Sequence, residues 1–132
     1  MDPLIKKMIT NAHGALNHAY APYSKFTVAA CIQADDGSLH TGINVENASY
    51  GLTICAETSS ICNMVSSLGA QKIRSMVILC GRNDLCAPCG ACRQRIYEFS
   101  KPETMIYLCD KNSVLKSLSI QELLPLAFDF KP

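Results

Sequence analysis

The chain has 132 residues, of which 48% are hydrophobic and 17% charged, and its formal net charge is +1. This length suits one domain with its own core, and the apolar content excludes intrinsic disorder, which needs low hydrophobicity and high net charge. A near-neutral chain also lacks the cationic footprint of a duplex-binding protein, so we expect no nucleic-acid partner. We expect residues 1–132 to form a single domain.

The N-terminal sequence lacks the basic segment and following apolar stretch of a secretory signal. The longest unbroken runs of aliphatic residues and cysteine, such as Met76–Cys80, have five residues. Spanning a bilayer needs about 20. We therefore expect no membrane partner and a cytoplasmic location, where the eight cysteines stay reduced.

Hydrophobic periodicity predicts the elements of the chain. Apolar residues at steps of three and four predict helices, and short apolar or alternating runs bounded by turn residues predict strands. In chain order we predict a helix over residues 4–19, strands over 26–32 and 39–45, a polar functional loop over 44–53, a helix over 55–68, a strand over 73–80, a helix over 89–100, strands over 104–109 and 114–118, and a short helix after Ser119.

These elements predict the fold class. Strands alternate with helices after the first hairpin, which indicates a mixed sheet with helices on both faces. The strand over 73–80 is strongly apolar, and we expect it near the centre of the sheet. We therefore predict an α/β protein, a three-layer α/β/α sandwich with a mixed central sheet of about five strands.

Position divides the cysteines into two groups. Cysteines inside apolar strands or a helix body are expected in the core, because free cysteine is among the most buried residue types. These are Cys31, Cys62, Cys80 and Cys109. Unpaired amides at a helix start stabilise a thiolate, so cysteines there are candidates for chemistry. These are Cys55, Cys86, Cys89 and Cys92.

The segment from Cys86 to Cys92 fits three chemistries. Cys86 and Cys89 match a thioredoxin-like redox pair, and with Cys92 they match part of an iron–sulfur run. Cys89 and Cys92 with a distant third ligand match a zinc site. Cys55 and Glu57 at the other helix start favour hydrolytic zinc, which needs a third ligand and a non-ligating acid. Both helices must then aim their N-termini at one metal ion.

The run Cys55-Ala56-Glu57 followed by Pro88-Cys89-Gly90-Ala91-Cys92-Arg93-Gln94 resembles the zinc-dependent cytidine deaminases, in the form with three cysteine ligands. Residues 21–26, 42–50, 122–125 and Phe128 resemble that family in the same order. The resemblance implies hydrolytic removal of the 4-amino group of cytidine or deoxycytidine, giving uridine or deoxyuridine and ammonia, as in pyrimidine salvage. It also implies one Zn²⁺ per chain, held by Cys55, Cys89 and Cys92.

The resemblance also implies roles for other residues. Glu57 would carry protons between the attacking water, ring N3 and the departing amine. Asn44 and Glu46 would hold the ribose hydroxyls of the nucleoside substrate, with Val45 between them at the sugar.

Further contacts follow from the same family. Ala56 would offer backbone groups to the pyrimidine edge, and Phe26 would pack against the ring. Residues matching Tyr50 and Phe128 come from neighbouring subunits in this family. We therefore expect a homotetramer with shared active sites.

One departure from the family concerns charge at the metal. Thr58 stands where the family commonly has an arginine that donates to the ligand sulfurs. Three thiolates and one Zn²⁺ carry a net charge of −1, which donors to the sulfurs can offset. We expect the two helix N-termini and Arg93 to provide this compensation.

Several alternatives remain open from the sequence. A blasticidin S-type aminonucleoside deaminase would use the same zinc chemistry, although the run from Asn44 to Tyr50 favours a cytidine-type ribose pocket. A thiol oxidoreductase would use Cys86 and Cys89. A non-enzymatic structural zinc module would need a fourth ligand, for which Cys86 is the candidate, although we expect Cys86 to be a bystander.

Overall fold

A mixed sheet forms the middle layer of the computed structural model, which describes residues 1–130. The strand order is β2-β1-β3-β4-β5, in which β3 and β4 pair in parallel and the other neighbours pair antiparallel. The strands are β1 (Val28–Ala34), β2 (Leu39–Ile43), β3 (Ile73–Cys80), β4 (Ser100–Cys109) and β5 (Val114–Ser119). The five-stranded mixed sheet and the central position of β3 are confirmed.

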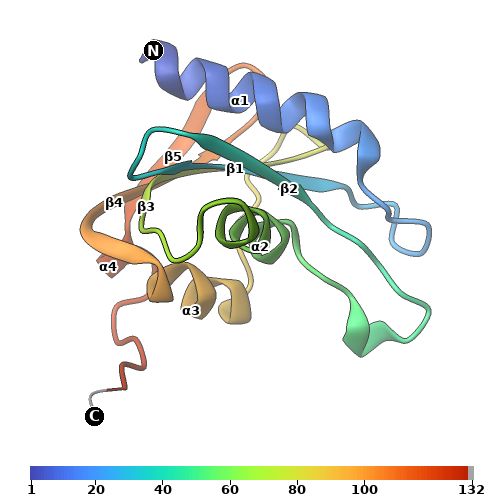
Figure 1. Cartoon of the computed structure of the whole chain (residues 1–132). Coiled ribbons are helices and arrows are strands. Elements are labelled where there is room, and N and C mark those ends of the chain that lie inside the picture. The colour runs from blue at the N-terminus through green and yellow to red at the C-terminus, as the bar shows by residue number, and fades with distance from the viewer. Residues whose placement is uncertain (131–132) are drawn as a thin grey trace.

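Helices cover both faces of the sheet, which confirms the three-layer α/β/α arrangement (Figure 1). The helix α1 (Pro3–Ala15) lies on one face, and α2 (Ala56–Leu68), α3 (Gly90–Glu98) and the short α4 (Ile120–Leu123) lie on the other. Each face has its own apolar core, and β1 and β3 contribute side chains to both. None of the helices in residues 1–130 is long and apolar enough to cross a membrane.

The helix ends follow their capping residues. The Asp2 carboxylate accepts the amide of Leu4 at 2.8 Å, and Gly69 ends α2 with a positive φ of 75°. Ser119 and Glu122 form the predicted capping box at α4. The first helix is shorter than predicted, because its α-helical part ends at Ala15 and a 3₁₀ turn follows.

The strand β1 begins two residues later than predicted. The side-chain amide of Asn44 donates to the carbonyl of Phe26 at 2.8 Å and accepts the amide of Val28 at 3.0 Å. These bonds take the place of a strand partner, so the chain before Val28 leaves the sheet.

The expected burial of cysteines holds for three of them. Cys31, Cys80 and Cys109 are buried, whereas Cys62 is exposed. The prediction for Cys62 was wrong because the buried face of α2 includes Ile61, and the next residue points about 100° away around the helix.

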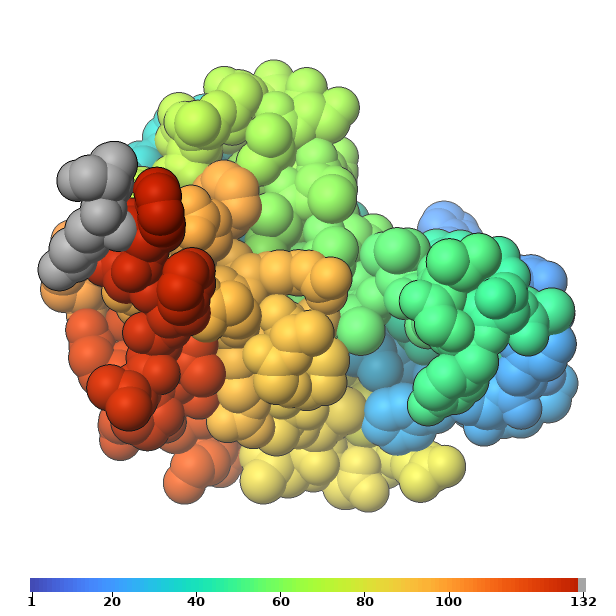
Figure 2. All heavy atoms as spheres, turned by 90° about the horizontal axis from the view of Figure 1, so that it is seen from below, coloured from blue at the N-terminus to red at the C-terminus, as the bar shows by residue number. Residues whose placement is uncertain are grey.

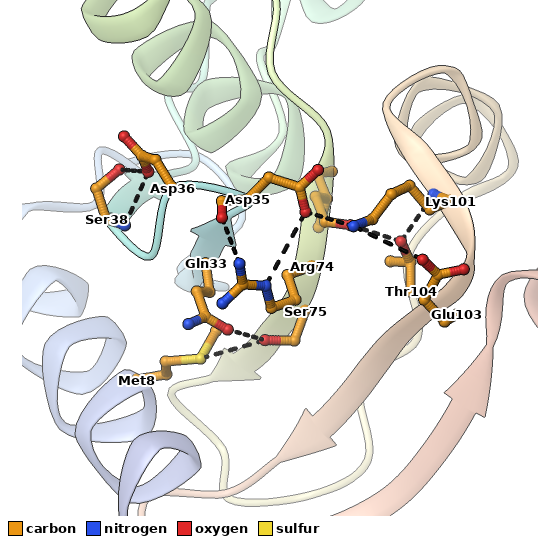
Figure 3. A network of polar contacts seen from close by, with 11 residues as sticks. Met8, Gln33, Asp35, Asp36, Ser38, Arg74, Ser75, Lys101, Glu103 and Thr104 are labelled. Carbon is orange, nitrogen blue, oxygen red and sulfur yellow. Dashed lines mark hydrogen bonds and ion pairs between the residues drawn. The ribbon is translucent and has the colours of Figure 1, made fainter.

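Charged residues tie the β1–β2 turn to the starts of β3 and β4 (Figure 3). Lys101 Nζ lies 2.6 Å from Asp35 Oδ1, and the Arg74 guanidinium donates to the Asp35 carbonyl. The hydroxyl of Thr104 accepts the amide of Lys101 and donates to the Ile73 carbonyl. This network lies where β3 begins. That end of the strands is opposite to the end at which β2 and β3 finish.

Candidate active site

The strand directions bring two helix N-termini together. Both β2 and β3 run antiparallel to β1, so they run parallel to each other and end at the same edge of the sheet. The chain passes from β2 to α2 and from β3 to α3. Cys55 is the N-cap residue of α2, and Cys89 is the N-cap residue of α3. Two cysteines distant in sequence therefore meet at one edge.

Three thiols form a cluster at this edge. The sulfur atoms of Cys55, Cys89 and Cys92 all lie within 4.8 Å of one another. A tetrahedral zinc ion with Zn–S bonds of ~2.3 Å separates its sulfurs by about 3.8 Å, so the donor set fits zinc. Three protein ligands leave one position open for water, which is the arrangement of a catalytic site.

The electrostatics of the cluster also fit a cation. Burial, and then the neighbouring Cys92, raise the pKa of Cys55 to about 12. Burial and the nearby Glu57 raise the pKa of Cys92, whereas the Cys92 amide at the start of α3 lowers that of Cys89. Three adjacent thiols can ionise together only when a positive ion balances them.

The fourth candidate thiol, that of Cys86, lines the same cleft as Cys55 and Cys89 but lies outside the cluster. Among residues 1–130, the group of side chains that are close enough together to hold a metal ion does not include Cys86. The Cys86 thiol interacts with that of Cys80, whose sulfur lies 3.4 Å from the Asp84 carboxylate. This position provides no fourth ligand for a structural zinc module.

Glu57 lies in the first turn of α2 and is only 5% exposed. Burial raises the pKa of its carboxyl group, because low-dielectric surroundings disfavour the ionised form. The side chain lines the same cleft as Cys55 and Cys89. A carboxyl that can hold a proton beside a metal-binding cluster is suited to general acid and base chemistry.

Two adjoining clefts lie over the cluster and share Thr53, Cys55 and Cys89. The smaller has a volume of about 220 Å³, and its walls include Phe26, Asn44, Ala56 and Glu57. The larger has a volume of about 560 Å³, and its walls include Tyr23, Ser24, Glu46 and Tyr50. In Figure 2 the segment of residues 44–54 faces α3 and the 81–88 loop across this hollowed surface.

Asn44 and Glu46 hold the walls of these clefts in place. The Asn44 amide fixes Phe26 and Val28, as described above. Glu46 accepts the amides of Tyr23 and Ser24 at 3.0 and 3.1 Å and the Ser24 hydroxyl. The Ser24 hydroxyl lowers the pKa of Glu46, so this carboxylate is ionised at neutral pH.

The remaining predicted residues are more dispersed. Val45 pairs with Tyr20 and Ile54 through isolated bridges, is 42% exposed and lines neither cleft. Tyr50 is 92% exposed and lies on the rim of the larger cleft. Phe128 is 71% exposed and lines neither cleft of its own chain, and its backbone binds the side chain of Gln94.

The structure adds contacts that sequence reasoning missed. The Arg82 guanidinium lies 4.9 Å from the centre of the Phe26 ring, a cation–π contact that no motif indicated. Arg93 donates to the carbonyls of Pro88 and Leu123 and makes no hydrogen bond to the thiols among residues 1–130, so a contribution of its charge to the thiols stays a prediction. It is Arg95 that connects to Cys92, through Thr58.

Comparisons with known proteins agree with this geometry. Residues 3–109 match the family model for the cytidine and deoxycytidylate deaminase zinc-binding region. The chain is 40% identical over 114 residues to cytidine deaminase of Mycoplasma pneumoniae, covering 86% of this chain and 85% of that protein. It is 36% identical over 124 residues to cytidine deaminase of Sporosarcina psychrophila, covering 94% and 90%. The crystal structure of cytidine deaminase from Mycobacterium tuberculosis superposes with a TM-score of 0.84 at 36% identity, covering 98% of this chain and 99% of that one.

Proposed function

This chain belongs to the cytidine and deoxycytidylate deaminase family, and we propose that it hydrolyses cytidine and deoxycytidine to uridine and deoxyuridine. Water replaces the 4-amino group, which leaves as ammonia. The observation that carries this proposal is the cluster of three thiols within 4.8 Å beside the buried carboxyl of Glu57 in one cleft. These groups supply a metal-binding site and a proton carrier.

The metal site is assigned to Cys55, Cys89 and Cys92, with one Zn²⁺ per chain. Bound zinc supplies a water molecule whose pKa is lowered from its bulk value towards neutrality. The N-termini of α2 and α3 support the thiolates, since helix starts favour negative charge.

Glu57 is assigned the proton transfers. Its carboxylate accepts a proton from the attacking water and delivers it to ring N3, which makes C4 more electrophilic. It then moves the proton of the hydroxyl added at C4 to the amino group, so that the C4–N bond breaks with ammonia rather than an amide ion as the leaving group. A buried carboxyl whose pKa is raised above its ordinary value by burial suits both directions of transfer.

The two clefts are assigned to the two parts of the nucleoside. The smaller cleft takes the base, with Phe26 against the ring and the Ala56 backbone at its edge. Asn44 in the wall of the smaller cleft and Glu46 in the larger cleft take the ribose hydroxyls, with Val45 between them along the chain. The amide oxygen of Asn44 and the carboxylate of Glu46 can each accept a hydrogen bond from a ribose hydroxyl. The bond to the carboxylate is the stronger one, because its acceptor is ionised.

We assign a homotetramer to the working enzyme. Large apolar side chains are exposed near the clefts and in the C-terminal segment, and burying them is favourable. They include Tyr50, Leu52, Ile54, Leu126, Phe128 and Phe130. In such an assembly Tyr50 and Phe128 would complete a neighbouring active site. Residues 1–132 would act as one catalytic domain in the cytoplasm, in pyrimidine salvage.

One experiment tests this function. Purified wild-type protein, Glu57→Gln and Glu103→Gln are incubated with cytidine and deoxycytidine, ultraviolet absorbance follows the loss of the aminopyrimidine, and zinc is measured per chain. Wild type and Glu103→Gln, whose exposed carboxylate pairs with Lys101 at 3.7 Å, should turn over. Glu57→Gln should keep its zinc and lose activity by several orders of magnitude.

Other outcomes would redirect the assignment. Full zinc occupancy with no turnover by the wild type would favour a structural zinc module. Turnover of blasticidin S in place of cytidine would favour the related aminonucleoside activity.

A further inference from the structure

A short chain of hydrogen bonds leads from the protein surface to the buried thiol of Cys92. Arg95 Nη1 donates to Thr58 Oγ1 at 3.2 Å, and this oxygen lies 3.5 Å from Cys92 Sγ. We propose that Arg95 is a positioning residue of the metal centre, which acts through Thr58 to stabilise the negative charge on the Cys92 sulfur. The inference rests on the zinc site proposed above.

The direction of the bonds follows from the chemistry of the groups. A guanidinium has only donors, so Arg95 must occupy a lone pair of the Thr58 oxygen. The hydroxyl then has its single hydrogen free to donate, and the sulfur of Cys92 is its described side-chain partner. The hydroxyl also keeps a second lone pair, so it is the ionisation of Cys92 that sets the direction: a thiolate has no hydrogen, and its sulfur can only accept from Thr58.

The position of each residue on its helix makes the contact possible. Arg95 follows Cys92 by three residues on α3, and Thr58 follows Cys55 by three residues on α2. Residues three apart share a helix face, so each member of the pair projects from the same side as a metal ligand. The two helices contact each other, and Thr58 bridges them.

The surroundings of Arg95 leave its charge available. The groove beside it has a volume of about 530 Å³ and apolar walls that include Ile61, Val65 and Phe99. Glu98 also lines this groove, yet no carboxylate in residues 1–130 lies within ion-pair distance of Arg95. Arg95 itself is exposed, so water screens its charge at longer range and its effect on the sulfur passes through the hydrogen bond to Thr58.

This arrangement places a positive charge near the negatively charged metal site. Three thiolates on one Zn²⁺ leave a net charge of −1, and donors to the sulfurs tune such sites. Where the family commonly has an arginine, this chain has Thr58, which alone supplies only a neutral hydrogen bond. Arg93 is held by two carbonyls. Arg95, which like Arg93 lies on α3, supplies a cation that reaches the sulfur through the Thr58 hydroxyl.

The test measures zinc affinity in full-length protein, by competition with a chromophoric chelator. The variants are Thr58→Val, which keeps the shape and loses the hydroxyl, Thr58→Ser, which keeps the hydroxyl, and Arg95→Met. The control Arg74→Met removes an equal charge at the opposite edge of the sheet, where Arg74 binds Asp35. Circular dichroism of the zinc-free forms checks that each variant folds.

We expect Thr58→Val and Arg95→Met each to weaken zinc binding about 10-fold, the lower end for partners that support metal ligands. The double variant should be no weaker than Thr58→Val, because Arg95 acts through that hydroxyl. Thr58→Ser and Arg74→Met should bind as the wild type does. In steady-state kinetics, kcat should fall in both single variants while KM stays constant.

Contrary results are equally clear. Additive losses in the double variant would show that Arg95 acts independently of Thr58, and unchanged affinity in Arg95→Met would remove its role. Wild-type protein that binds zinc without deaminating cytidine would overturn the proposed function alone. The zinc affinities of the variants would still show whether Arg95 acts on Cys92 through Thr58. Wild-type protein that binds no zinc would overturn both.

Discussion

Alanine at position 42 is expected to push the metal-binding end of α2 away from the sheet. Gly42 lies in β2 where this strand passes α2, and a Cβ atom there would lie 2.2 Å from Ser60 N and 2.6 Å from the Ala56 carbonyl oxygen. Ordinary contact begins near 3.4 Å, so the two backbones would have to separate by about 1.2 Å. The opposing atoms belong to the backbone, so no change of rotamer relieves the clash.

The expected cost follows from this geometry. Overpacking a core costs about 1–3 kcal/mol, and a clash between backbones belongs at the upper end. In a chain of this size, 1 kcal/mol corresponds to roughly 3–5 °C in Tm, so Gly42→Ala should lower Tm by about 10 °C. Cys55 caps the displaced helix, so the sulfur cluster should open and zinc binding should weaken.

Thermal unfolding followed by circular dichroism, with and without added zinc, measures both effects. Gly14→Ala is the matched control, because a Cβ atom at Gly14 meets nothing within 4 Å. Gly14 lies inside α1, where alanine is favoured over glycine by about 1 kcal/mol, so the control should be slightly more stable. A Gly42→Ala protein with the Tm and zinc content of the wild type would refute the reasoning.

Three further predictions concern other parts of the chain. Arg82→Ala removes the cation–π contact with Phe26, worth about 0.5–1 kcal/mol, so steady-state kinetics should show KM raised about 2–5-fold and kcat unchanged. Ser119→Ala removes the cap of α4 and should lower the free energy of unfolding in urea by about 1 kcal/mol, whereas an unchanged midpoint would contradict a stabilising cap. The Asn112 amide and the Ser113 hydroxyl lower the pKa of Asp110, so its stabilisation is present above the unfolded-state pKa and lost as pH falls through the folded-state pKa. The Tm difference between wild type and Asp110→Asn should therefore shrink on acidification, and a constant difference would count against it.

Chemistry that depends on neighbouring residues could be predicted from the sequence. The thiols of Cys55 and Cys89 were expected at helix starts because thiolates are stabilised there, and both prove to be N-cap residues. Cys92 follows on the same face of α3, since three residues make nearly one helical turn. The requirement that both helices point at one metal ion could be deduced before the strand order was known.

Contacts between distant segments could not be predicted in this way. Thr58 and Arg95 lie 37 residues apart, and nothing in their local sequence indicates that α2 and α3 place them together. Arg93 is nearer to the ligands in sequence, but the turn before α3 and the end of α4 supply carbonyls that hold it. Cys62 has apolar neighbours on a helix, yet its exposure depends on which face of that helix meets the sheet.

Asn44 and Glu46, which we assign to the sugar, show how one side chain can serve both the fold and a binding site. The Asn44 side chain donates one hydrogen bond to Phe26 and accepts one from Val28. The Glu46 carboxylate accepts the amides of Tyr23 and Ser24. An amide has two donors and two lone pairs, and a carboxylate has about four acceptor sites. Each side chain therefore keeps hydrogen-bonding capacity for a substrate after fixing the wall of the cleft. Because the wall is already ordered, a nucleoside would bind without the entropic cost of immobilising that segment.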